Sequence, residues 1–126
     1  MSDATTRVID AYLDAYSEPD RARRAATVAD IWSGDGRLID PPLEGRGHDG
    51  ISAQADALLS QFPGHRFVRS SAVDAHHGFA RYGWQLKNGA GAVVLEGQDF
   101  AEIDAAGRLQ RVVGFFGPLT PLAAAA

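Results

Sequence analysis

The sequence predicts an α+β domain with helices in the first half of the chain and β-strands in the second half. Three segments before residue 65 place apolar residues three and four positions apart, as on one face of a helix. After residue 65, segments rich in β-branched and aromatic residues are separated by glycine-rich turns. A run of helices followed by a run of hairpins is typical of an antiparallel sheet that helices cover on one face.

Three helices are predicted in order along the chain. The first covers residues 8–16, with Tyr12 on its buried side. The second begins near Pro19 and ends before "SGDG" at residues 33–36, and the third runs from Asp49 to "PG" at residues 63–64. Their apolar stripes are Val8, Ile9, Tyr12, Leu13 and Tyr16; Ala22, Ala25, Ala29 and Trp32; and Ile51, Ala55, Leu58, Leu59 and Phe62.

Two acidic residues in the predicted strands are candidates for a chemical role. A short strand at residues 37–40 ("RLID") ends at Asp40, because the prolines at positions 41 and 42 cannot continue a ladder inside a sheet. Successive hairpins follow over residues 66–75, 78–86, 92–103 and 108–116. Alternation along residues 92–103 places Asp99 on the same face as Leu95 and Ala101. A carboxylate on an apolar face is costly unless it is hydrogen-bonded, paired or protonated.

The composition indicates one folded domain. The chain has 126 residues, 45% of them hydrophobic, and a formal net charge of −4. We interpret the "RARR" cluster at residues 21–24 as the solvated face of a helix, so no nucleic-acid partner is expected. Cysteine is absent, and the N-terminal residues contain neither a secretion signal nor a membrane span. We therefore expect a cytoplasmic protein without a membrane partner, with one domain over residues 1–122 and a short alanine tail at 123–126.

Two other patterns are interpreted as structural. Gly45, Gly47 and Gly50 match the G-x-G-x-x-G pattern, but no βαβ unit surrounds them, so we predict a loop before a helix and no bound cofactor. His76 and His77 are adjacent, and adjacent residues of a strand face opposite ways, so we predict no metal site. A hydrogen-bonding role for His77 in a pocket stays open. The aromatic residues are core by default, with pocket lining as the alternative for Trp32, Trp84 and Phe115.

The order of these parts resembles the nuclear transport factor two-like superfamily, which includes the ketosteroid isomerases and the SnoaL-like polyketide cyclases. The resemblance rests on the tyrosine of the first helix, the strand ending in "IDPP", the "EGR" before the third helix, and "GQDFAEIDAAGRLQRVVGFF" at residues 97–116. It implies a cone, in which a strongly curved, mainly antiparallel sheet wraps around three helices and leaves a central cavity.

The resemblance also implies roles for individual residues. Asp40 would act as general base, Asp99 would donate a hydrogen bond to a developing oxyanion, and Tyr12 would be its partner donor, with Tyr16 one turn away as an alternative. The residues that would contact a small apolar substrate with a carbonyl group are Tyr16, Trp32, Trp84, His77 and Phe115. No cofactor is implied.

Two functional readings follow. The first is an acid/base enzyme of isomerase, cyclase or hydratase type, and the second is a ligand-binding or dimerisation module of the same fold. The outer face of the sheet resembles the surface through which superfamily members form homodimers, so a two-fold homodimer is expected. This face carries Arg81, Gln85, Lys87, Val94, Gln98 and Phe100.

Overall fold

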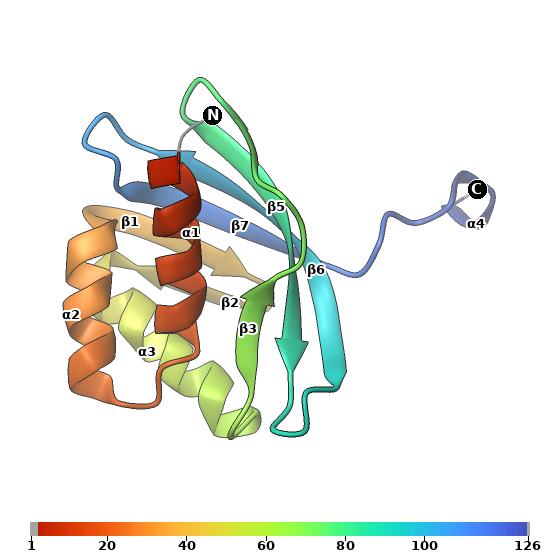
Figure 1. The fold of residues 1–126 in the computed structure, drawn as a ribbon, viewed down its shortest axis with the longest axis horizontal. Helices are drawn as coiled ribbons and strands as arrows, with labels where there is room; N and C mark the ends of the chain where they lie inside the picture. The colour runs from red at the N-terminus through yellow and green to blue at the C-terminus, as the bar shows by residue number, and fades with distance from the viewer. Residues whose placement is uncertain (1–2, 126) are drawn as a thin grey trace.

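The computed structural model describes residues 3–125 and confirms the α+β class. Helices α1, α2 and α3 lie on the inner side of a curved, seven-stranded sheet that does not close into a barrel (Figure 1). The elements in chain order are α1 Asp3–Tyr16, α2 Arg21–Ile31, β1 Trp32–Asp40, β2 Leu43–Arg46, α3 Gly47–Gln61, β3 Arg66–Arg69, β4 Asp74–His76, β5 Phe79–Lys87, β6 Val93–Ile103, β7 Leu109–Phe116 and α4 Leu122–Ala125.

The strands follow the order β2-β1-β7-β6-β5-β3, and β4 also pairs with β5. Every pair of strands is antiparallel except β1 with β7, which are parallel. The parallel pair places the end of β1 beside the end of β7. Asp99 of β6 lies opposite Tyr82 of β5 on one side and opposite Gly114 of β7 on the other. Because Ile39 pairs with Val113, Asp40 falls beside Gly114. The topology therefore places both predicted acids in one row across the sheet.

The strand β1 is longer than the sequence pattern suggests. It begins at Trp32 and includes "SGDG", which we had predicted as a helix stop, with an irregularity of register between Trp32 and Arg37. Residues 43–46, predicted as loop, form β2 against β1. A Cβ on Gly45 of β2 would come within 2.6 Å of the Gly50 carbonyl oxygen, so a glycine of the G-x-G-x-x-G pattern allows close packing of β2 on α3.

The second helix buries a different face from the predicted one. Its alanine stripe is exposed, whereas Arg24, Val28 and Ile31 are buried. Arg24 is only 2% exposed, so the interpretation of "RARR" as a solvated face is wrong at this position.

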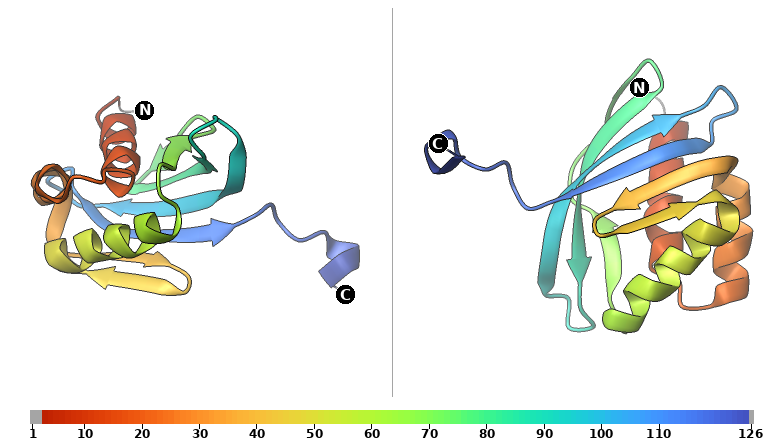
Figure 2. Two further views of the ribbon diagram at one scale, coloured as in Figure 1. Left: turned by 90° about the horizontal axis from the view of Figure 1, so that it is seen from below. Right: turned by 180° about the vertical axis from the view of Figure 1, so that it is seen from behind.

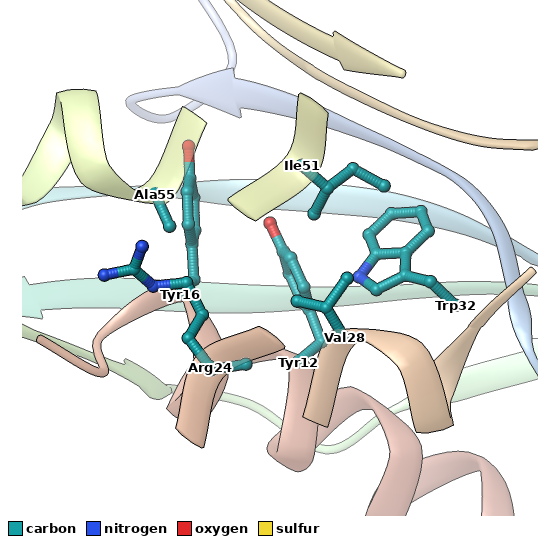
Figure 3. A pocket seen from close by; sticks show the side chains of 8 residues that line it. Tyr12, Tyr16, Arg24, Val28, Trp32, Ile51 and Ala55 are labelled. Carbon is teal, nitrogen blue, oxygen red and sulfur yellow. The ribbon is translucent and has the colours of Figure 1, made fainter. Parts of the chain in front are cut away.

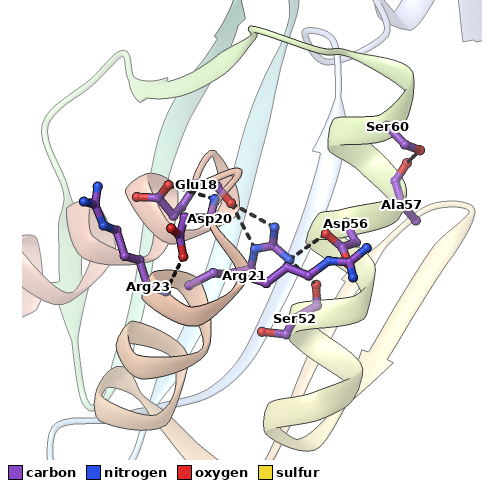
Figure 4. Close-up of polar contacts among 9 residues, drawn as sticks. Glu18, Asp20, Arg21, Arg23, Ser52, Asp56, Ala57 and Ser60 are labelled. Atoms are coloured by element: carbon purple, nitrogen blue, oxygen red, sulfur yellow. Dashed lines mark hydrogen bonds and ion pairs between the residues drawn. The ribbon is translucent and has the colours of Figure 1, made fainter.

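The Arg24 guanidinium of α2 bonds to the loop between α1 and α2 and to α3. Figure 4 shows the residues that it contacts, Glu18, Ser52 and Asp56. It donates to the Glu18 carbonyl at 2.9 and 3.1 Å, to the Ser52 carbonyl at 3.1 Å, and to the Asp56 carboxylate at 2.9 Å. Arg21 forms a second ion pair with Asp56 from the surface. A charged group is tolerated in this core because its hydrogen bonds and its charge are satisfied.

The end of the chain lies apart from this body. After β7 the chain runs outward to the short helix α4, as the views in Figures 1 and 2 agree. The predicted tail at 123–126 thus includes residues of α4, while Ala126 lies outside the described residues. Within residues 3–125, no helix has the length and apolar character that crossing a bilayer requires.

Candidate functional site

Asp40 and Asp99 face one spot on the inner side of the sheet. Asp40 is 8% exposed and Asp99 is 4% exposed. A Cβ placed on Gly114 would lie 2.8 Å from Asp40 Oδ1 and 3.1 Å from Asp99 Oδ1. The two carboxyl oxygens are therefore no further apart than the sum of these distances. A glycine between them leaves room for both side chains.

Asp40 is held by a chain of hydrogen bonds from two helices. Tyr16 of α1 donates its hydroxyl proton to Asp40 Oδ2 at 3.0 Å, and Gln54 of α3 donates its Nε2 proton to Tyr16 Oη at 3.3 Å. The other carboxyl oxygen, Oδ1, is buried and has no protein partner among the described residues. Burial raises the pKa of Asp40, while the bond from Tyr16 favours the charged form and opposes that rise.

Asp99 has a different environment. Tyr82, its cross-strand neighbour, donates to Asp99 Oδ2 at 2.8 Å. Burial in the apolar interior raises the pKa of Asp99 to about 7, and the nearby charge of Asp40 adds to the rise, whereas the bond from Tyr82 and the Trp84 indole oppose it. Near neutral pH, Asp99 is therefore partly protonated and able to donate a hydrogen bond.

Tyr82 was not among the predicted site residues. One feature of the sequence indicated a role for Tyr82. It lies on the same alternating face as Trp84, in the strand that precedes the strand of Asp99. Each acid thus has one tyrosine donor, Tyr16 for Asp40 and Tyr82 for Asp99.

Tyr12 lies beside Tyr16 one helical turn away. Their rings stack at 5.7 Å, and Trp32 meets Tyr12 edge-on at 5.8 Å. Figure 3 shows both hydroxyls pointing the same way, toward the α3 residues Ile51 and Ala55. Burial raises the pKa of Tyr12, and the charge of Asp99 contributes. Tyr16 is thus committed to Asp40, whereas no hydrogen bond of the Tyr12 hydroxyl is seen within residues 3–125.

The enclosed cavity next to these rings is small. It is lined by the side chains shown in Figure 3 and has a volume of about 10 Å³, which is room for about one water molecule. Any ligand with several carbon atoms therefore requires the lining side chains to move.

The structure is similar to a crystal structure of a proposed isomerase of the SnoaL-like family from Agrobacterium tumefaciens. The TM-score is 0.87 at 34% identity, over 93% of this chain and 100% of the other. The chain belongs to the SnoaL-like family. No protein-family model matches the sequence, and neither does any curated protein.

More distant structures share the fold of this SnoaL-like protein. A protein of unknown function with a cystatin-like fold from Methylobium petroleophilum gives a TM-score of 0.71 at 21% identity, over 98% of this chain and 82% of the other. A proposed SnoaL-like polyketide cyclase from Jannaschia sp. gives 0.68 at 15% identity, over 92% and 89%. At these identities the likeness establishes the fold alone.

Two predicted contact residues of the SnoaL-like protein lie away from the pair of acids. Phe115 is 57% exposed on the outer face of the sheet, because alternation along β7 turns Gly114 inward and Phe115 outward. Its neighbour Phe116 instead meets the buried Trp84 edge-on at 5.7 Å.

His77 is the second predicted contact residue that lies away from the two acids. It is exposed in the turn between β4 and β5, with φ of 51°. This left-handed conformation brings its Nδ1 to 3.1 Å from Nδ1 of His76, so the argument that adjacent side chains face opposite ways does not apply to this pair.

Proposed function

We propose that this SnoaL-like protein is a cofactor-independent acid/base enzyme of isomerase or cyclase type, acting on a small, largely apolar carbonyl compound. The observation that supports the proposal most is the pair of buried carboxyls at Gly114, which share one spot but have different hydrogen-bond partners. Two titratable groups whose environments give them different pKa values are suited to acid/base catalysis, because one can be charged while the other is protonated.

In the proposed reaction, Asp40 removes a proton from the carbon next to the carbonyl group. The C–H electron pair forms the enolate, and protonated Asp99 with the Tyr12 hydroxyl donates hydrogen bonds to its oxygen. Asp40 then returns the proton at another carbon, which gives an isomer. Alternatively, the enolate carbon attacks a second carbonyl carbon of the same molecule, the C=O π electrons move to that oxygen, and the resulting alkoxide takes the proton from Asp40, which closes a ring.

This scheme predicts a bell-shaped dependence of kcat/KM on pH. Activity rises as Asp40 loses its proton, and falls with an apparent pKa of about 7 as Asp99 loses its own. A profile that stays flat from pH 6 to pH 9 would contradict the role of Asp99 as donor.

The substrate is sought by thermal shift, followed by assays of turnover. Carbonyl-containing polycycles, hydroxylated polyketides and small lactones are screened for a rise in melting temperature, because a ligand of the folded state stabilises it. On a compound that is converted, Asp40→Asn should lower kcat by a factor of about 10² or more. Asp30→Asn, an exposed position on α2, is the matched control. Undiminished turnover by the Asp40 variant would show that the assigned base is wrong.

The nearly filled cavity favours a second candidate, a non-catalytic ligand-binding or dimerisation module. Under this alternative the acids are buried groups satisfied by tyrosines. The two candidates differ in their substrate assays: a module binds a compound without converting it, and Asp40→Asn then changes affinity alone.

We also propose that the protein forms a homodimer through the outer face of the sheet. Phe79, Phe100 and Phe115 are exposed there, and Phe100 and Phe115 contact each other at 5.7 Å. Clustered apolar side chains on a surface are typical of a protein–protein interface. A monomer mass in sedimentation experiments would contradict this proposal.

A further inference from the structure

The residues after β7 form an apolar arm whose two leucines are exposed. This C-terminal arm, residues 117–125, points away from the body in both Figure 1 and Figure 2. The bond from the Gly117 N–H to the Glu96 carbonyl, at 2.8 Å, is the last hydrogen bond to the body that is seen within the described residues. Beyond it, Leu119 and Leu122 are each 87% exposed. Two large aliphatic side chains held in solvent gain free energy on binding an apolar surface.

The outer face of the sheet carries a groove of matching character. Phe79, Phe100 and Val113 line it, from three adjacent strands, and its volume is about 320 Å³. The charged side chains at the groove, Glu102 and Arg111, neutralise each other in an ion pair of 3.0 Å. The groove therefore favours an apolar, uncharged occupant.

The C-terminal arm has this chemistry. The sequence "GPLTPLAAA" contains no ionisable side chain. Pro118 and Pro121 limit its conformations, so that less conformational entropy is lost when the arm binds. The arm continues outward from the end of β7 (Figure 2), and none of its described residues is among those that line the groove of its own chain.

We propose that the C-terminal arm of one copy binds in the outer-face groove of a second copy, with Leu119 and Leu122 as its anchors. In a two-fold dimer the contact occurs twice, since each copy supplies one arm and one groove. This proposal adds a contact to the dimer proposed above and is independent of any enzymatic activity.

Disulfide cross-linking tests the contact directly, because the natural chain has no cysteine. Leu122→Cys is prepared on a tagged chain and Val113→Cys on an untagged chain, and the two are mixed and oxidised. A covalent dimer of one tagged and one untagged chain is the expected product. The control replaces Val113→Cys with Asp30→Cys, at an exposed position on α2. A yield no greater than in this control would overturn the proposal.

Sedimentation equilibrium measures the contribution of the anchors. The double variant Leu119→Ala with Leu122→Ala should raise the dimer Kd by at least about tenfold, as for anchor residues of other interfaces. Thr120→Ala, in the same arm, should leave the Kd unchanged. Both variants should keep the wild-type unfolding midpoint at concentrations where the protein is monomeric, because these residues lie outside the core. A dimer that the double variant leaves as tight as wild type would retain the sheet-face interface and overturn the contact with the arm.

Discussion

Replacing Asp99 with asparagine should stabilise the protein at neutral pH relative to wild type. Asparagine has nearly the shape of a neutral carboxylic acid, and its Oδ1 can accept the hydrogen bond that Tyr82 now donates. The variant therefore keeps the packing of the protonated side chain and removes the possibility of a buried negative charge.

The magnitude follows from the pKa of Asp99, which burial raises from 3.8 to about 7. Below the ordinary value, the side chain is protonated in both the folded and the unfolded chain, and wild-type stability is unaffected. Between the two values the unfolded chain has released its proton while the folded chain retains it, so the free energy of unfolding decreases as the pH rises. Each pKa unit corresponds to about 1.4 kcal/mol, so the loss amounts to about 4 kcal/mol once the pH exceeds 7. This is a large fraction of the stability of a typical domain.

Urea denaturation at pH values from 4.5 to 8.5 measures this effect. The free energy of unfolding of Asp99→Asn minus that of wild type should increase with pH and level off above 7, because titrating groups that do not interact with Asp99 cancel in the difference. Asp30→Asn, on the surface, supplies the control and should change the free energy of unfolding by about 0.5 kcal/mol or less. If the difference for Asp99→Asn does not change with pH, the folded-state pKa of Asp99 is ordinary and the reasoning from burial is wrong.

Three further variants test the surroundings of the site and the second helix. Gly114→Ala places a methyl group against both carboxyls and should destabilise the fold by about 1–3 kcal/mol, whereas Gly34→Ala, whose Cβ would meet nothing within 4 Å, should be nearly neutral in the same urea titration. Arg24→Ala leaves the Glu18 and Ser52 carbonyls without this donor, while Asp56 keeps its ion pair with Arg21, and should cost about 1–3 kcal/mol, against about 0.5 kcal/mol or less for the exposed Arg23→Ala. Tyr16→Phe removes the hydroxyl donor to Asp40 and should raise the pKa of the Asp40 carboxyl, as carbon-detected NMR titration would show; an unchanged value would contradict the bond.

The sequence predicted the fold and the two acids because local pattern determines both. Helical spacing placed the three helices, and turn residues marked the later strands. Asp40 was found from the prolines that follow it, and Asp99 from alternation along one strand. That the two acids face each other followed only from the resemblance, since it depends on the parallel pairing of β1 with β7.

Tyr82 and Gln54 were missed for reasons of register and tertiary packing. A bulge in the β5–β6 hairpin, between Leu86 and Lys87, shifts the register by one residue, so counting back from the turn does not give Tyr82 as the partner of Asp99. Gln54 looks like an ordinary helical residue, and it reaches Tyr16 only because α3 packs beside α1. Arg24 was misjudged because a charged cluster in a sequence does not reveal that one member meets Asp56 from another helix.

The hydrogen-bonded chain from Gln54 through Tyr16 to Asp40 has at each end an oxygen that is unpartnered within residues 3–125. Asp40 Oδ1 and Gln54 Oε1 are buried and have no protein partner among the described residues. Each such atom destabilises the folded state by about 1–3 kcal/mol unless water or a ligand bonds to it. These two oxygens therefore lie at the two ends of one chain of hydrogen bonds, and each can accept a donor that the described residues do not supply.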